Sequence, residues 1–467
     1  MSLLDVPAPD VRVPLDDLAD ALGEGRVLTD TDTTGRYVHD EAEWAPAGAP
    51  LAVVRARSTA EVQTVVRWCV AHGVPLVPRG AGTGLSGGAN ALPGCIVLSL
   101  EAMDAVLEVN AAEHLAVVQP GVVNDALRAR CAQDGLWYPP DPASSPWSTL
   151  GGNVSTNAGG LCCVKYGVTG DYVLALEVVN GRGEVVRLGR RTAKGVAGYD
   201  LTHLLVGAEG TLGVVTEITV RLRPARAPEA TVAGYFSSAV DAGRAVAAIA
   251  AAGVRPSALE LLDKHCLKAV DEWKNLGLSM EAEVVLLGRS DAPGAAGDAE
   301  AAQMLACFEA AGATWAAQST DQAEADALFE ARRLAYPALE RLGPLLTEDV
   351  CVPVAALPEM LGRIEATARA HDTRIANIAH AGDGNLHPLI ITTPGDDAAR
   401  ARAQLAFDQI IADALDLGGT VTGEHGVGLL KMAGLAQELG PEVVAMHRAV
   451  KQALDPHGIL NPGKVVP

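Results

Sequence analysis

The sequence lacks any long apolar run. Its 467 residues contain no stretch that approaches the roughly 18 to 20 uninterrupted apolar residues of a membrane-spanning helix. The N-terminus, MSLLDVPAPDVRVPLDD, carries acidic residues early and has no basic region followed by an apolar block, so it does not resemble a secretory signal. We therefore expect a soluble, cytoplasmic protein.

Positive charge is also scarce. Lys and Arg total 36 against 57 Asp and Glu, which gives a formal net charge of −21. A surface this acidic does not attract nucleic acid or an anionic membrane, and it repels an anionic substrate at long range. Binding a carboxylate would therefore require a local positive centre, which is an Arg, a Lys or a metal ion.

Cysteine pairs of the metal-binding type are missing. None of the eight cysteines forms a Cys-x-x-Cys pair, which argues against an iron–sulfur cluster or a structural zinc. Disulfides are not expected in a cytoplasmic protein. We interpret the adjacent Cys162 and Cys163 as two small residues packed near a Gly-rich loop.

The remaining composition is that of a folded protein with more than one domain. Hydrophobic residues make up 49% of the chain, which is ample for sizeable cores. At roughly 150 residues per domain, the length suggests about three units or two larger ones. Composition changes after a linker at 224–228 (PARAP), and both halves mix strand and helix patterns. Strands are expected near 51–56, 74–78, 95–100, 105–119, 172–179, 184–188, 213–223, 283–288 and 350–354, and helices near 58–72, 122–134, 238–252, 298–311, 322–341, 357–370 and 397–417.

A Gly-rich loop follows the second expected strand. Residues 78–89 read PRGAGTGLSGGA, in which Gly82, Gly84 and Gly87 spell G-x-G-x-x-G. A nicotinamide-binding Rossmann loop must open a helix, but Pro93 and Gly94 forbid one here and the next expected element is a strand. We interpret the loop instead as a nest of backbone N–H groups for phosphate. The alternative is a flexible surface loop.

Two further clusters are rich in Gly, Asn and Ser. Residues 144–160 read SSPWSTLGGNVSTNAGG and residues 207–215 read GAEGTLGVV. Three such clusters in one half of the chain can wrap a long ligand that has phosphates and a polar ring. A dinucleotide fits that description better than a mononucleotide does.

A fourth group of residues has the composition of a metal and acid–base site. His380 and His387 flank a Gly-Asp-Gly turn, and a chain reversal at 382–384 could bring them together. Glu424 and His425 follow in Gly-Glu-His-Gly. Two imidazoles and a carboxylate leave open positions on zinc, iron or manganese, which a substrate carboxylate and hydroxyl could fill. The alternative is that these are ordinary core or surface histidines.

Taken together, these motifs resemble the FAD-linked D-2-hydroxy acid dehydrogenases, the glycolate oxidase and D-lactate dehydrogenase relatives within the vanillyl-alcohol oxidase superfamily. The resemblance covers roughly residues 40–465. The motifs that carry it occur in this order: PRGAGTGLSGGA, PPDPASS, GGNVSTNAGG, AGYDLTHLLVGAEGTLGVVTE, HAGDGNLHP, GEHGVG and DPHGILNPGK.

The resemblance implies an α+β fold with a two-subdomain FAD-binding domain of the vanillyl-alcohol oxidase (PCMH) type and an α+β substrate or cap domain. We expect the FAD domain at 1–225, the substrate domain with the metal site at 226–425, and a C-terminal return to the FAD domain at 426–467. The cofactor contacts implied are Arg79, Gly80, Ala81, Gly82, Thr83, Gly84, Ser86 and Gly87 for the pyrophosphate, Pro140, Asp141, Gly151, Gly152, Asn153, Ser155, Thr156 and Gly159 for the flavin and ribityl chain, Glu209, Gly210, Gly213 and Val215 for the adenine end, and Asn461 for the ring.

The resemblance also implies roles at the metal site. His380, His387 and Glu424 match metal ligands, and His425 matches the base. Arg332 matches an arginine that grips the substrate carboxylate, with Arg333 or a merely solvated helix face as the alternatives.

Two departures from relatives in the superfamily refine these expectations. Some of those relatives tether FAD through a His in the Gly-rich loop, but no His lies between residues 73 and 113, so we expect non-covalent FAD. Tyr336 and Thr347 stand where the resemblance places the Thr and Lys of 2-hydroxyglutarate dehydrogenases, which favours a monocarboxylate substrate such as lactate or glycolate.

The activity expected is FAD-dependent oxidation of a small 2-hydroxy acid to the 2-oxo acid. The hydride passes to flavin N5 while His425 takes the hydroxyl proton beside the metal, most simply zinc, with manganese or iron as alternatives. The rivals are a metal-independent sugar or alditol oxidase and a non-catalytic flavoprotein subunit of a larger complex. The electron acceptor, which could be a quinone, a cytochrome, an electron-transfer flavoprotein or oxygen, stays open, as does a homodimer.

Overall fold

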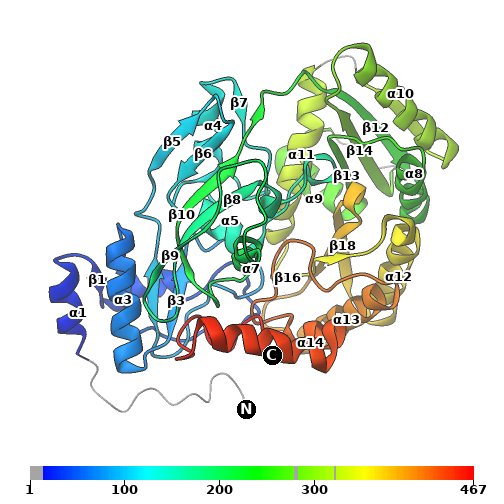
Figure 1. Cartoon of the computed structure of the whole chain (residues 1–467). Coiled ribbons are helices and arrows are strands. Elements are labelled where there is room, and N and C mark those ends of the chain that lie inside the picture. Colours follow the sequence, from blue (N-terminus) through cyan, green and yellow to red (C-terminus); the bar gives the residue numbers. More distant parts are fainter. Residues whose placement is uncertain (1–13, 278–281, 320–321, 467) are drawn as a thin grey trace. The chain divides into compact units, whose positions relative to one another are not determined.

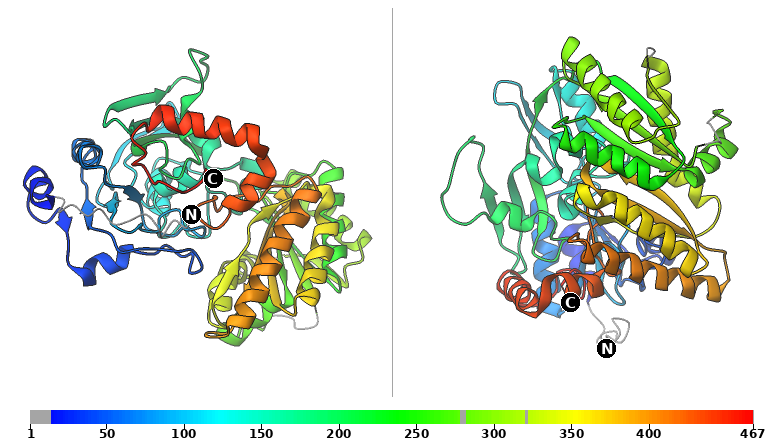
Figure 2. Two further views of the ribbon diagram at one scale, coloured as in Figure 1. Left: turned by 90° about the horizontal axis from the view of Figure 1, so that it is seen from below. Right: turned by 90° about the vertical axis from the view of Figure 1, so that its right-hand side faces the viewer.

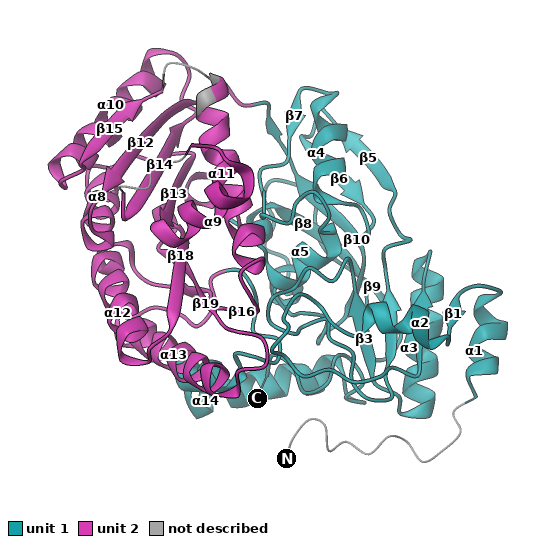
Figure 3. Cartoon of the chain, turned by 180° about the vertical axis from the view of Figure 1, so that it is seen from behind, with its two compact units in different colours: residues 1–158, 168–225, 424–467 teal, residues 159–167, 226–423 magenta. Residues whose placement is uncertain are grey.

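The computed structural model describes residues 14–277, 282–319 and 322–466, and the chain divides into two compact units (Figure 3). Unit 1 contains the chain up to residue 158, residues 168–225 and the chain from residue 424 onward. Unit 2 contains residues 159–167 and 226–423. A unit boundary falls at the expected linker, whereas residues 159–167 belong to unit 2 and residues 424 and 425 to unit 1.

The first sheet of unit 1 has four strands in the order β1-β2-β4-β3 (Figure 1). Strands β2 and β3 each run parallel to β4. The elements here are α1 (Leu15–Leu22), β1 (Val27–Leu28), α2 (Thr31–Thr34), η2 (Gly35–Tyr37), β2 (Ala52–Arg55), α3 (Thr59–His72), β3 (Leu76–Arg79) and β4 (Ile96–Ser99). The loop after β3 leads directly to strand β4 and opens no helix, which confirms that it is not a Rossmann loop.

Helix α3 shows how local sequence sets these boundaries. The Ser58 side chain accepts a hydrogen bond from the Glu61 amide, and Glu61 in turn accepts one from the Arg57 amide. The helix ends at Gly73, which has the left-handed φ of +63° that glycine adopts at little cost. Both ends lie where the sequence predicts them.

The second sheet of unit 1 is antiparallel, in the order β5-β6-β10-β8-β9. The strands expected near 172–179 and 184–188 are confirmed as β8 and β9, which pair directly as a hairpin around Asn180. The elements are β5 (Val106–Asn110), β6 (Leu115–Val118), α4 (Asn124–Ala132), β7 (Leu136–Trp137), α5 (Leu150–Thr156), η3 (Thr169–Tyr172), β8 (Val173–Val179), β9 (Val185–Gly189), α7 (Leu201–Leu205), β10 (Val214–Arg221), β11 (Arg223–Pro224) and α14 (Met432–Leu454).

Unit 2 is built on one eight-stranded antiparallel sheet in the order β15-β12-β14-β13-β18-β19-β16, with β17 paired to β19. Its strands are β12 (Ala230–Phe236), β13 (Ala258–Asp263), β14 (Val284–Ser290), β15 (Trp315–Gln318), β16 (Leu345–Thr347), β17 (Val350–Cys351), β18 (Arg374–His380) and β19 (Asn385–Ile391). Its helices are α6 (Cys163–Tyr166), α8 (Ala239–Ala251), α9 (Lys264–Lys274), α10 (Ala295–Ala310), α11 (Gln322–Glu340), η4 (Val354–Ala356), α12 (Leu357–Ala370), η5 (Ala381–Asp383) and α13 (Asp397–Asp416).

Helices cover both faces of this sheet. Helices α8, α10, α12 and α13 pack in a row on one face, as Figure 2 shows, and α9 and α11 pack together on the other. The core beneath α9 and α11 contains Leu262, Val285, Ile378 and Leu389, which alternate along their strands with residues of the opposite face. This alternation decides which polar side chains meet α11.

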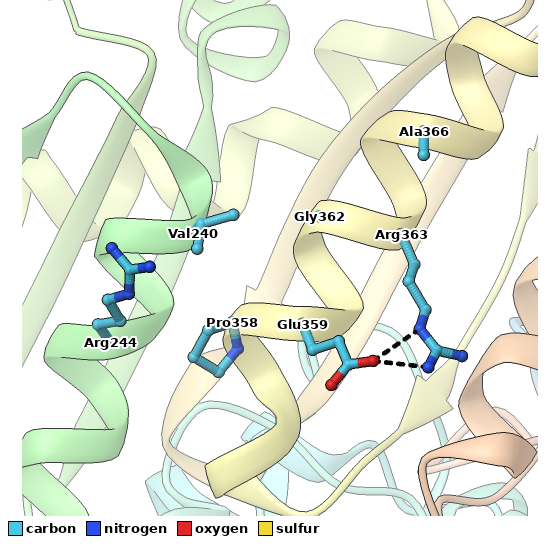
Figure 4. Close-up of a pocket in the computed structure, with 7 residues that line it drawn as sticks. All are labelled: Val240, Arg244, Pro358, Glu359, Gly362, Arg363 and Ala366. Carbon is cyan, nitrogen blue, oxygen red and sulfur yellow. Dashed lines mark hydrogen bonds and ion pairs between the residues drawn. The ribbon is translucent and has the colours of Figure 1, made fainter.

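A shallow site outside the predicted residues lies on one face of unit 2. A hollow between α8 and α12 (Figure 4) is lined by Val240, Arg244, Pro358, Glu359, Gly362, Arg363 and Ala366, none of which is a predicted site residue. Within the described ranges, no helix combines the length and apolar character needed to cross a membrane.

Candidate functional site

The α9/α11 face of unit 2 gathers four polar residues that the fold places by strand alternation. Glu260 lies two residues before Leu262 on β13, and His380 lies two residues after Ile378 on β18, so both share the face of this core. His387 on β19 is likewise two residues before Leu389. Arg332 comes from α11, and all four side chains are buried.

The two histidines are brought together by the chain reversal that the sequence predicts. Strands β18 and β19 form a hairpin through η5, in which His380 pairs with Asn385 and Ile378 pairs with His387. The two imidazole rings have their centroids 5.2 Å apart and are nearly perpendicular. Their potential ligand nitrogens lie within 4.8 Å of one another. Two buried imidazoles at this separation fit the donor chemistry of a divalent metal.

Glu260 joins His380 to Arg332. Its Oε2 atom accepts a hydrogen bond from Arg332 Nε at 2.7 Å, and Nδ1 of His380 lies 2.9 Å from Oε1 and 3.0 Å from Oε2. Burial alone would raise the pKa of the Glu260 carboxyl, but the charges and hydrogen bonds of His380 and Arg332 outweigh it and hold the pKa below its ordinary value. Glu260 is therefore a buried carboxylate with two donors.

A second buried carboxylate lies beside His387. Asp349 Oδ1 is 3.4 Å from His387 Nδ1 and accepts a hydrogen bond of 2.8 Å from Asn385. Its Oδ2 atom accepts one of 2.7 Å from Thr422. Asp349 and His387 also offer ligand atoms within 4.8 Å of each other, so Asp349 can either orient His387 or bind the metal beside it.

Glu424 and His425 begin the last segment of unit 1, directly after Gly423. The amide of Gly423, the last residue of unit 2, donates to the Asp349 carbonyl at 2.9 Å. His425 Nε2 lies 3.9 Å from Glu424 Oε1.

Within unit 1, two side chains hold the backbone that follows His425. Ser86 Oγ donates to the Gly426 carbonyl at 2.8 Å and to the His425 carbonyl at 3.3 Å. Glu209 accepts hydrogen bonds from the amides of Val427 at 2.7 Å and Gly428 at 3.0 Å. Burial raises the pKa of Glu209 to about 7, against these two hydrogen bonds, which lower it.

Arg79 supports the Gly-rich loop from beneath. Its guanidinium donates to the carbonyls of His39 at 2.9 Å and Ala89 at 3.4 Å, and the side chain is buried. Gly82 has φ +79°, and a Cβ there would lie 2.0 Å from Arg79 Nη2. The loop can therefore fold over the guanidinium only because residue 82 is glycine.

The three Gly-rich clusters converge in unit 1. A Cβ at Gly80 would lie 2.2 Å from Thr149 Oγ1, which joins the first cluster to the second. A Cβ at Gly88 would lie 2.6 Å from Glu209 Oε2, which joins the first to the third. Asn461 Nδ2 donates to the carbonyls of Gly88 at 2.9 Å and Glu209 at 2.8 Å, so the C-terminal return meets the same place.

Buried polar atoms around these clusters lack protein partners. Among the described residues, Asn153 Nδ2, Thr149 Oγ1 and Asn461 Oδ1 are buried without a hydrogen bond. Buried polar groups in native proteins are nearly always paired, so these atoms fit a polar ligand such as a dinucleotide. The other predicted contact residues of unit 1 lie in the same segments, at 79–87, 140–141, 151–156, 209–215 and 461, whereas Gly159 belongs to the segment of unit 2.

Sequence reasoning missed Glu260 and Asp349. The signal for Glu260 was a single acid inside the apolar stretch ALELLD, where a charge is costly to bury unless it is paired. The signal for Asp349 was the acidic pair 348–349 between two short strands. Arg333, the alternative to Arg332, is exposed and makes an ion pair of 3.8 Å with Glu330.

Comparison with known proteins decides the family. Residues 50–189 match the FAD binding domain, and residues 226–465 match the C-terminal domain of FAD linked oxidases. The chain belongs to the FAD-linked oxidases. Within that family, it resembles relatives that carry the names of hydroxy acid enzymes.

Two of these relatives and one solved structure illustrate the likeness. The chain is 40% identical over 463 residues to the glycolate oxidase subunit GlcD of Bacillus subtilis (strain 168), covering 99% of this chain and 96% of the relative. It is 35% identical to the D-lactate dehydrogenase of Anaerostipes hadrus, covering 94% of each. The 4-ethylphenol oxidase structure from Gulosibacter chungangensis superposes with a TM-score of 0.79 at 21% identity over 97% of each chain. This last likeness confirms the vanillyl-alcohol oxidase type of fold.

Proposed function

We propose that this FAD-linked oxidase converts a small 2-hydroxy acid, of the D-lactate or glycolate type, to the 2-oxo acid. The observation that carries the proposal is the buried set His380, His387 and Arg332 on one face of unit 2. This set combines two imidazoles that can bind a divalent metal with a guanidinium that can bind the substrate carboxylate. Relatives over nearly the whole chain are named for glycolate and D-lactate, which supports the same substrate class.

The chain's own residues divide the work. Bound FAD supplies a hydride acceptor, and a bound divalent metal supplies a Lewis acid that makes the substrate hydroxyl more acidic. His380, His387 and Glu424 hold that metal, and Arg332 binds the substrate carboxylate. His425 takes the hydroxyl proton, because an imidazole accepts a proton readily near neutral pH.

FAD is held without a covalent bond in this proposal. The match to the FAD binding domain, residues 50–189, lies in unit 1 apart from the segment 159–167. The Gly-rich loop there carries no His. In the part of the chain that the structure describes, backbone amides and the unpaired side-chain atoms of Asn153 and Asn461 are groups that can bind the cofactor.

The substrate is a monocarboxylate. Arg332 is the one predicted carboxylate-binding residue, and the second position at which a dicarboxylate enzyme would need a cation carries Thr347, which is buried on β16. Tyr336, on α11, packs against the unit 2 core. A second carboxylate would therefore be desolvated without a partner, which is costly.

The test is anaerobic bleaching of the flavin. The purified protein is mixed without oxygen with glycolate, D-lactate, L-lactate, D-2-hydroxyglutarate and an alditol, and the flavin absorbance is followed. We expect bleaching by glycolate or D-lactate and little by the dicarboxylate or the alditol. Bleaching by the alditol alone, or by nothing, would refute the proposed substrate class.

The role of His425 has its own prediction. His425→Asn should keep its FAD and metal but reduce its flavin about 10²- to 10⁴-fold more slowly, which is the usual cost of losing a general base. Stopped-flow flavin reduction at saturating substrate and metal analysis check this. A wild-type rate would place the base elsewhere, and loss of metal would make His425 a ligand.

A further inference from the structure

Glu260 holds two residues of the proposed site with one carboxylate. It lies in the middle of β13, is fully buried, and has hydrogen bonds to His380 and to Arg332. We propose that Glu260 is a positioning residue that sets the ring of His380 for the metal and the guanidinium of Arg332 for the substrate carboxylate. This inference rests on the function proposed above.

Glu260 determines which ring nitrogen of His380 carries the hydrogen. An ionised carboxylate only accepts hydrogen bonds, so a ring nitrogen at 2.9 Å from it must carry the hydrogen. Glu260 therefore fixes the hydrogen of His380 on Nδ1 and leaves Nε2 with its lone pair. Metal-binding imidazoles are commonly oriented in this way by a carboxylate behind them, which also makes the ring a better donor to the metal.

Glu260 also sets the orientation of the Arg332 guanidinium. Glu260 occupies its Nε atom, while among the described residues no hydrogen bond reaches the two terminal Nη atoms. The guanidinium is planar, so fixing Nε fixes the direction in which both Nη atoms point. The free edge can then bind a carboxylate through two parallel hydrogen bonds, which is the geometry that arginine provides and lysine does not.

The two roles of Glu260 require a charged carboxylate at this position. A carboxylate has an oxygen for each donor, whereas an amide has one acceptor oxygen and an NH₂ group that would face a donor. Burying Glu260 without partners would be costly, and its negative charge offsets the positive charge of the buried Arg332. One residue thereby links metal binding to substrate binding.

The experiment measures metal affinity in the FAD-loaded protein. Wild type and Glu260→Gln are stripped with a chelator and titrated with Zn²⁺ by calorimetry. We expect the dissociation constant for Zn²⁺ to rise about 10- to 100-fold in the variant, which is the usual effect of losing such an orienting group. The concentration of D-lactate or glycolate that gives half-maximal flavin reduction should rise as well, while FAD content stays unchanged.

The matched control is Asp263→Asn. Asp263 is another buried carboxylate on β13, but it accepts hydrogen bonds from the amides of His265, Cys266 and Asn377 rather than from the site. Its loss should lower the melting temperature and leave the affinity for Zn²⁺ unchanged. Equal weakening of Zn²⁺ binding in both variants would mean general destabilisation and would overturn the inference.

The remaining outcomes are distinct. Unchanged Zn²⁺ affinity in Glu260→Gln overturns the positioning role and leaves the proposed function standing. Failure of the wild type to bind Zn²⁺ overturns the proposed metal site and this inference with it. If Glu260→Gln does not yield FAD-loaded protein, Glu260→Asp replaces it, because its shorter side chain cannot reach both partners. Unchanged Zn²⁺ affinity in that variant is equally contrary.

Discussion

Glu209 shows how a single buried side chain can hold a backbone segment that is far away in the sequence. Its backbone has a φ of +47°, in the left-handed region that few residues other than glycine adopt, and its carboxylate is buried. Both oxygens receive backbone amides of the segment just after His425. The cofactor contact expected from the sequence stays a prediction, and the hydrogen bonds support a further role in holding that segment.

The pKa of about 7 makes Glu209 a source of pH dependence. Because the pKa of Glu209 is higher in the folded protein than in the unfolded chain, protonation of Glu209 adds to the free energy of unfolding at low pH. This contribution is lost as the pH rises from about 4.5 to 7. The full change is about 3 kcal/mol. Neighbouring charges act in opposite directions, since Lys464 lowers the pKa of Glu209 and Asp40 raises it.

We expect the stability of wild type, relative to Glu209→Gln, to fall between pH 5 and pH 7.5. The glutamine has no charge to bury, so the variant lacks this contribution at both pH values. Urea unfolding midpoints of the two proteins check the prediction, with the pH 5 pair as the internal reference. A difference that stays constant or grows with pH would contradict the raised pKa.

Among single residues, the sequence predicts those that stand in a recognisable motif. His380 and His387 stand in a turn motif that can be recognised in the sequence, and the structure brings them together. Glu260 could not be placed in the same way, because its partners Arg332 and His380 lie 72 and 120 residues away in the chain. Only the folded sheet shows that one carboxylate reaches both.

The β18–η5–β19 hairpin positions the two histidines as one element. Its turn ends at Gly384, which has φ +77°, and a Cβ there would lie 2.1 Å from the Val352 carbonyl oxygen. Gly384→Ala must therefore displace the turn or the neighbouring backbone. We expect it to lower metal content and to destabilise the protein by about 1–3 kcal/mol or more.

The control for this turn is Gly395→Ala. Gly395 has an almost equal φ of +76°, but a Cβ there would meet nothing within 4 Å. It should cost about 1 kcal/mol from backbone strain and retain full metal. Metal analysis and thermal unfolding of both variants decide the matter, and equal metal content in the two would show that the turn does not set the histidines.

The Gly-rich loop after β3 is the corresponding element for the cofactor. Gly82→Ala places a Cβ against the buried guanidinium of Arg79, so we expect the loop to shift and FAD to be lost during purification. Gly73→Ala is the control, because its φ is +63° and a Cβ there would meet nothing within 4 Å. FAD released on denaturation, measured per chain, is the readout, and equal FAD in both variants would contradict the role of the loop.

Elements with clear local signals were predicted, and those without were not. The N-terminal cap of α3 at Ser58 and the turn of the β8–β9 hairpin identify their elements from a few neighbouring residues. Strand β13 is buried along its whole length and so shows no alternation, and β18 is buried at six of its seven positions. Such strands are defined by partners far away in the sequence, which local patterns cannot show.

At the scale of the whole molecule, the chain crosses between its two units four times. Residues 159–167 leave unit 1 to pack in unit 2, where Lys165 and Tyr166 both bind Asp291. Gly382 fits against Val164 there, because a Cβ at residue 382 would lie 2.7 Å from the valine side chain. Nothing local in the sequence distinguishes this segment from its neighbours, so the sequence predicts the linker at 224–228 but not this exchange.

The function proposed above requires that a metal held by His380 and His387 assists the oxidation that reduces FAD. The most direct measurement is the rate of anaerobic flavin reduction by saturating D-lactate or glycolate, in wild-type protein as purified, after chelation, and after Zn²⁺ or Mn²⁺ is restored. We expect that chelation leaves FAD bound and slows reduction by about 10²-fold or more, because a Lewis acid is lost. One metal per chain should then restore the rate. Reduction at the full rate in the metal-free protein would contradict this requirement.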